Sequence, residues 1–156
     1  MLKRVPREVY PAQWTYHMSL ALISLGRFDE ASREIESALA ANVPDQTGVV
    51  HSIRALLRAQ QGDRKGAEAD IAAAIRIGTG FGHFHHAAYA FGQVYSVLGD
   101  LDRAQEWIEK AANEGFPCYT LFETDPFLER LRGSARFRTF VTALRKEWEH
   151  IPGETD

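Results

Sequence analysis

The sequence predicts an all-α fold in which three helix hairpins follow one another and further helices cover the last hairpin. Two observations predict it. Three segments align with one another without gaps: LGRFDEASREIESAL from Leu25, QGDRKGAEADIAAAI from Gln61 and LGDLDRAQEWIEKAA from Leu98. Apolar and small residues also recur in and before these segments every three or four residues, which is the spacing of one face of an α-helix. Each unit is therefore expected to be a helix, a tight turn and a second helix.

The first helix of each unit is expected to end at a glycine, namely Gly26, Gly62 or Gly99. Glycine lacks a Cβ and readily takes the left-handed backbone conformation that closes a hairpin. Seven residues before each of these glycines stands a small residue: Ser19, Ala55 and Gly92. Small side chains at these places predict that the two helices of each hairpin cross closely.

The second helix of each unit carries a repeated apolar face. Alanine follows the turn glycine by five residues, isoleucine by nine and another alanine by twelve, so that all three share one side of a helix. The residues are Ala31, Ile35, Ala38, Ala67, Ile71, Ala74, Ala104, Ile108 and Ala111. The acidic residues of these helices lie away from that face and are expected on a solvated surface: Glu30, Glu34, Glu36, Glu68, Asp70, Glu106 and Glu109.

The C-terminal segment is expected to cap the last hairpin, because the open end of a stack of repeats exposes apolar surface. Asp125-Pro126 is typical of a helix start, and Ser134 precedes a helix with one apolar face. That face contains Phe137, Phe140, Val141, Leu144 and Trp148. The predicted organisation is a lead-in at 1–11, repeats within 12–118 at about 12–45, 48–81 and 85–118, capping helices at 119–150 and a tail at 151–156.

This pattern resembles the tetratricopeptide repeat (TPR), a helix hairpin of 34 residues with small residues in both helices, a turn glycine and a late proline. The resemblance implies a right-handed α-α superhelix. The chain departs from the family pattern in three ways: its turn-to-turn periods are 36 and 37 residues, its second unit lacks a late proline like Pro44 or Pro117, and Arg58 stands where the other units have Leu22 and Tyr95.

Segments such as GHFHHAAY, GFPCY and the C-terminal tail are also similar to the ends of repeat modules in bacterial serine/threonine kinases, adenylate cyclases and transcriptional regulators. This similarity implies a bacterial signalling protein, of which the chain would be the C-terminal part. The N-terminal stretch MLKRVPREVYPAQW has two prolines and no apolar core, unlike a signal peptide. A cytoplasmic location is therefore expected.

The charge and composition of the chain limit the kinds of partner that it is expected to bind. The net charge of −3 offers no general reason to expect nucleic acid. No apolar run reaches the roughly 18 residues of a membrane span, so no membrane insertion is expected. The single cysteine, Cys118, cannot form an internal disulfide, and its neighbours Phe116, Pro117 and Tyr119 suggest an ordinary buried cysteine rather than a nucleophile. We expect no enzyme activity and no cofactor.

The segment GFGHFHHAAY contains His83, His85 and His86, which, with His51 and His17, could form a metal site. No cysteine accompanies them, and adjacent helical residues such as His85 and His86 diverge by about 100°. We therefore expect the start of a helix and no metal site. The glycines at 78, 80 and 82 could instead form a phosphate loop, but a helical pattern precedes them and no Lys-Ser or Lys-Thr follows, so a loop between repeats is favoured.

The resemblance implies that partners bind the concave surface, which the first helices line. The repeat alignment places these residues on it: Gln13, Tyr16, His17, Leu20, Ser52, Ile53, Leu56, His86, Tyr89 and Gln93. Leu20, Ile53 and Leu56 could equally belong to the core. The leading hypothesis is a non-catalytic scaffold that binds a peptide or partner domain in this groove. A regulatory or sensory module of a larger signalling protein is the alternative, a histidine-based metal protein is less favoured, and a homodimer stays open.

Overall fold

The structure is a computed structural model and describes residues 10–150. In this range it contains helices and no strand, which confirms the predicted all-α class. The helices are α1 (Pro11–Ser24), α2 (Phe28–Ala40), α3 (Val49–Gln60), α4 (Arg64–Gly78), α5 (His85–Leu98), α6 (Leu101–Asn113), α7 (Tyr119–Thr124), the 3-10 helix η1 (Pro126–Leu128), α8 (Glu129–Arg132) and α9 (Ala135–Glu149). None of them is long and apolar enough to cross a membrane.

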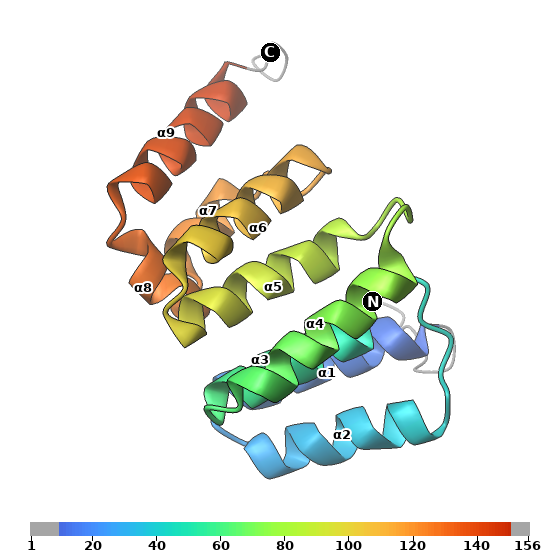
Figure 1. The fold of residues 1–156 in the computed structure, drawn as a ribbon. Coiled ribbons are helices and arrows are strands. Elements are labelled where there is room, and N and C mark those ends of the chain that lie inside the picture. Colours follow the sequence, from blue (N-terminus) through green and yellow to red (C-terminus); the bar gives the residue numbers. More distant parts are fainter. Residues whose placement is uncertain (1–9, 151–156) are drawn as a thin grey trace, which may run out of the picture.

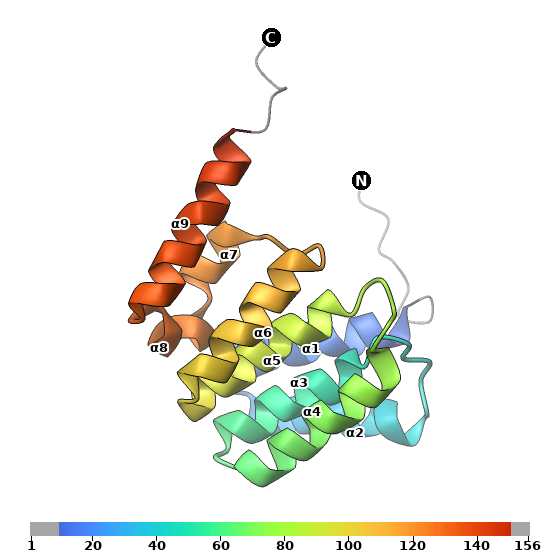
Figure 2. The ribbon, with the colours of Figure 1, turned by 45° about the horizontal axis from the view of Figure 1, so that its top comes forward.

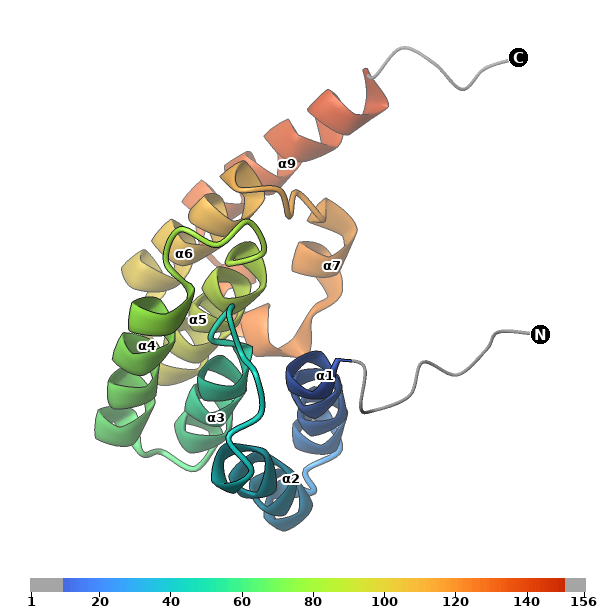
Figure 3. The same ribbon diagram turned by 90° about the vertical axis from the view of Figure 1, so that its right-hand side faces the viewer.

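The first six helices form three stacked hairpins, α1/α2, α3/α4 and α5/α6 (Figure 1). The first helices of the hairpins lie next to one another, since α3 packs between α1 and α5. Seen from the side, α1, α3 and α5 form an inner row, and α2, α4 and α6 lie outside it (Figure 3). This is the stacked α-α arrangement that the repeat pattern predicts.

The three turn glycines adopt the predicted left-handed conformation, with φ of 71° at Gly26, 79° at Gly62 and 80° at Gly99. The N–H of the residue after each glycine donates a hydrogen bond of 2.8–2.9 Å to the carbonyl oxygen five residues earlier, which closes the end of the first helix. In the second and third hairpins the same residue, Asp63 or Asp100, also caps the next helix with its carboxylate. One short turn therefore ends one helix and starts the next.

The predicted alanine and isoleucine face of the second helices is buried in all three units. The two helices of the third hairpin cross closely at Gly92 in α5, where a Cβ would be only 2.4 Å from Cδ1 of Ile108 in α6. The absence of a side chain at Gly92 lets these two helices approach. The sequence therefore predicted the internal packing of the hairpins correctly.

One acidic residue of the second helices, Asp70, does not lie on the solvated surface that the sequence predicts. Asp70 is only 2% exposed, so the prediction of a solvated side chain is wrong for this residue. Its carboxylate lies 2.7 Å from Nη2 of Arg54, 3.0 Å from Nη1 of Arg58 and 3.3 Å from Nδ1 of His51. Arg58 is the residue that departs from the repeat pattern, and Asp70 on the facing helix provides its ion-pair partner.

The environment of Asp70 favours the charged carboxylate. Burial alone raises the pKa of Asp70, but hydrogen bonds from His51 and Arg54 and the positive charges of Arg54 and Arg58 lower it by more. The carboxyl pKa therefore lies below its ordinary value. The second hairpin thus contains an interior ion-pair cluster in which two arginines share one buried carboxylate.

The C-terminal helices pack against the third hairpin, where η1 and α8 contact α5 and α8 also contacts α6. Phe122, Leu128, Leu131 and Phe137 are buried there. The last helix, α9, extends beyond the other helices at its C-terminal end (Figure 2). Trp148 is consequently exposed, although it shares the apolar stripe that begins with Phe137.

Candidate partner-binding surface

The predicted groove is partly filled by the cap. Oδ2 of Asp125, at the junction of α7 and η1, accepts hydrogen bonds from the Tyr89 hydroxyl and from Nε2 of Gln93 (2.6 Å). The Tyr89 ring also stacks on Phe122 of α7, with ring centroids 5.6 Å apart. All four side chains are buried. Segment 119–128 therefore covers the inner face of α5 around Tyr89 and Gln93.

Asp125 also acts on the first hairpin. Burial raises the pKa of the Tyr89 hydroxyl, and the charge of Asp125 and its hydrogen bond raise it further. Burial likewise raises the pKa of Tyr16 in α1, with a contribution from the charge of Asp125. Both hydroxyls keep their protons at neutral pH, so Tyr89 acts as a hydrogen-bond donor. The buried carboxylate of Asp125 thus binds two inward residues of the third hairpin, Tyr89 and Gln93.

The middle of the predicted groove belongs to the core. Ile53 and Leu56 are fully buried, which selects the core alternative for both residues. Ser52 is also buried, and its hydroxyl donates a 2.8 Å hydrogen bond to the Val49 carbonyl within its own helix. Leu20 is half-buried against the core. These residues do not present an open binding surface in this conformation.

The exposed part of the predicted set lies on α1. Gln13 and His17 are exposed, and His86 at the start of α5 is half-buried. The His17 ring meets the buried Tyr16 ring edge to face, with centroids 5.1 Å apart. The structure thus leaves Gln13 and His17 accessible, and their role in binding stays a prediction.

The exposed side of α1 also carries large apolar residues that the proposed groove did not include. Trp14 and Met18 are each 39% exposed, and Tyr10 and Leu25 are more exposed still. They recur every three or four residues with Ala21, so they follow one face of the helix. We call the set Tyr10, Trp14, Met18, Ala21 and Leu25 the α1 stripe. In the sequence, the signal for this stripe is the recurrence of Trp14, Met18 and Leu25 every three or four residues.

The repeat alignment explains why this face is apolar. Trp14 aligns with Val50 in α3 and Ala87 in α5, and Met18 aligns with the half-buried Arg54 in α3 and with Phe91 in α5. Val50, Ala87 and Phe91 are buried. They lie on helices that pack against the preceding hairpin. Among the described residues no hairpin precedes α1, so its equivalent face stays open.

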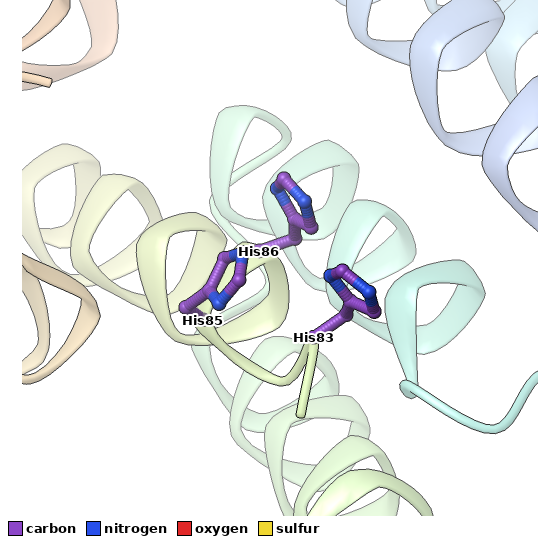
Figure 4. Close-up of side chains that lie close together, drawn as sticks. All are labelled: His83, His85 and His86. Atoms are coloured by element: carbon purple, nitrogen blue, oxygen red, sulfur yellow. The ribbon is translucent and has the colours of Figure 1, made fainter. Parts of the chain in front are cut away.

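The histidines before and in α5 lie together. Each of His83, His85 and His86 offers a ring nitrogen, and these three atoms lie within 4.8 Å of one another (Figure 4). The rings of His85 and His86 are 4.4 Å apart, so the expectation that these neighbours diverge is wrong. Burial lowers the pKa of His86 to about 4, and the nearby His85, His83 and His17 contribute. His86 is therefore uncharged at neutral pH.

The remaining reactive side chain lies elsewhere on the surface. Cys118 is exposed, which corrects the expectation of a buried cysteine. It precedes the first residue of α7, where the chain leaves the third hairpin to form the cap.

Among the three hairpins, the third matches a known protein family. A tetratricopeptide repeat family model matches residues 85–113, which are α5 and α6. No curated protein and no solved structure gave a significant match. The matched repeat and the all-helical stack support a protein of the TPR type, a class that generally mediates protein–protein contacts.

Proposed function

We propose that this protein is a non-catalytic protein–protein interaction module and that the exposed face of α1 is its binding surface. The match of α5 and α6 to the TPR model supports an interaction role in general. The observation that carries the choice of surface is the exposure of Trp14 and Met18. The equivalents of these two residues in the later repeats are buried, except for Arg54, which is half-buried in its ion pair with Asp70.

The chemistry of this face suits a protein partner. Tryptophan, tyrosine and methionine are enriched at protein interfaces, because they bury a large apolar area. Gln13 and His17 border the α1 stripe, since each stands one residue before Trp14 or Met18 and therefore about 100° around the helix. A partner on this face would meet an apolar strip with hydrogen-bonding groups along one edge.

The internal packing indicates what kind of partner fits. In the second and third units the equivalent face is covered by α-helices of the preceding hairpin. The partner we propose is therefore an amphipathic helix or helix pair whose apolar side covers the α1 stripe. A second copy of this chain could supply such a helix, because α1 carries both the open face and the apolar residues.

The inner groove is the less favoured surface. A peptide entering next to α5 would have to displace segment 119–128 and break the hydrogen bonds of Asp125 with Tyr89 and Gln93. Buried donors left without acceptors cost about 1–3 kcal/mol each. The exposed face of α1 carries no such cost. The alternative of a regulatory module in a bacterial signalling protein rests on the sequence resemblance alone.

The test compares the wild-type chain with a Trp14→Ser/Met18→Ser variant and with a matched Trp148→Ser control, which removes an exposed tryptophan from α9. Retained proteins from a cell lysate are identified by mass spectrometry, and the molar mass of each pure protein is measured by light scattering. We expect the α1 variant to lose a partner that the control keeps, or to be monomeric where the control is dimeric. Identical partners and identical masses for all three proteins would exclude α1 as the binding surface.

A further inference from the structure

We propose that His83, His85 and His86 form a binding site for a divalent late transition-metal ion such as Zn²⁺. The site lies where the loop between the second and third hairpins enters α5 (Figure 4). Its three ring nitrogens lie within 4.8 Å of one another. The proposal does not depend on the protein-binding role of α1.

The local backbone brings these rings together. Phe84 is buried and its ring packs against Phe91 of α5, with centroids 6.0 Å apart. The backbone N–H of His86 donates to the carbonyl oxygen of His83 (3.3 Å), so the loop turns just before the helix. His83 and His85 flank the buried Phe84 and share the outer side of this turn. The ring centroid of His83 lies 5.6 Å from that of His85 and 6.3 Å from that of His86.

Two of the three rings are held in place. Nδ1 of His85 lies 3.1 Å from the carbonyl oxygen of Glu114. A carbonyl oxygen only accepts hydrogen bonds, so Nδ1 carries the proton in this contact and Nε2 keeps a free lone pair for a metal. The His85 ring also stacks on Phe116, and the half-buried His86 ring meets Phe116 edge to face. Ligands oriented in this way lose less conformational entropy when they bind an ion.

Small side-chain rotations would bring the three ring nitrogens to the distances at which they can bind one metal ion. Imidazole nitrogens bind Zn²⁺ at about 2.0–2.1 Å, so two of them on one tetrahedral ion lie about 3.4 Å apart. His83 is exposed on the loop and can rotate toward the other two rings. The ring nitrogens, which lie within 4.8 Å of one another, would then need to approach by at most about 1.4 Å to reach that separation of about 3.4 Å.

The ligand type selects the class of metal. Neutral imidazoles favour zinc, copper, nickel and related ions, whereas calcium and magnesium prefer oxygen ligands. Three protein nitrogens leave a fourth coordination position of a tetrahedral ion for water or another ligand. An ion at this place would join the inter-hairpin loop to α5, and through the His85 contact also to the end of the third hairpin.

The experiment titrates Zn²⁺ into the untagged, chelator-treated full chain by isothermal calorimetry, and Co²⁺ by visible absorption. The variants are His83→Ala and His86→Ala, with His150→Ala as a matched control that removes an exposed histidine after α9. We expect one ion per chain. Loss of a residue that only supports a metal ligand typically weakens metal binding by about 10–100-fold. We expect His83→Ala and His86→Ala to weaken Zn²⁺ binding by at least that much, and His150→Ala to leave the affinity unchanged.

Circular dichroism of each metal-free variant checks that the helices are intact. His83 is exposed, so its substitution gives a ligand test in a folded chain even if His86→Ala disturbs the packing against Phe116. No measurable heat or cobalt absorption in the wild type would overturn the proposal. Binding that persists unchanged in His83→Ala would overturn it as well, because the ion would then be held elsewhere.

Discussion

Truncating Asp125 to alanine should loosen the cap from the inner face of the repeats. The carboxylate accepts hydrogen bonds from the Tyr89 hydroxyl and from Nε2 of Gln93, and it caps η1 through the Phe127 N–H (2.8 Å). Tyr89, Gln93 and Asp125 are all buried. The Asp125→Ala variant would leave two buried donors without an acceptor and remove a helix cap.

The magnitude follows from these contacts. Two unsatisfied buried donors at about 1–3 kcal/mol each and a lost cap of about 1 kcal/mol add up to about 3–7 kcal/mol, and relaxation of the site places the expected loss in the lower half of that range. That is a large share of the roughly 5–15 kcal/mol that stabilises an ordinary domain. The free energy of unfolding is measured by urea denaturation followed by far-ultraviolet circular dichroism. A separate transition at low urea concentration would show that the cap unfolds before the repeats.

A matched control is Asp63→Ala, which removes an exposed helix-capping carboxylate that accepts a 2.8 Å hydrogen bond from the Gly66 N–H. It should cost only about 1 kcal/mol. A Tyr89→Phe variant, alone and combined with Asp125→Ala, measures the coupling between the hydroxyl and the carboxylate. If Asp125→Ala costs no more than the control, or if the two groups show no coupling, segment 119–128 is not held in the way the structure indicates.

Two further predictions concern the repeats themselves. Gly92→Ala should destabilise the chain by about 1–3 kcal/mol in a thermal melt, because its methyl group would collide with Ile108. Gly82→Ala, where a Cβ meets open space, should be nearly neutral, and equal effects of the two would contradict the close crossing. Asp70 has a lowered pKa in the folded chain, so its stabilising contribution is present above its unfolded value of about 3.9 and is lost as the pH falls through the folded value. Urea denaturation should therefore show a steeper loss of stability in acid for the wild type than for Asp70→Asn, and parallel curves would refute the role of this carboxylate.

Features that depend on short-range spacing were predictable. The left-handed turn glycines and the alanine and isoleucine faces recur at fixed intervals, and a helix converts those intervals directly into a buried side. Arg58 was visible as a departure from the pattern. Its buried partner Asp70 was not, because a carboxylate twelve residues later on another helix looks like any surface acid until the two helices pack.

The binding surface was harder to predict, because exposure depends on segments that are distant in sequence. Tyr89 and Gln93 do lie on the inner face of their helix, but whether they meet solvent depends on the cap that folds back over α5. Trp14 and Met18 align with positions that are buried in the later repeats, or half-buried in the case of Arg54, and no hairpin precedes α1 in residues 10–150. The histidine cluster depends on a turn that deviates from regular helix geometry just before α5.

The sequence by itself determined the helical class, the hairpin turns and the internal face of each unit, since these follow from local backbone preferences and from the helical period. The tertiary structure decided which inner residues the cap covers, which face of α1 stays open and how close the three histidines lie. Each of these properties depends on contacts between segments that are distant in sequence, so it is set only when the hairpins, the connecting loop and the cap pack together.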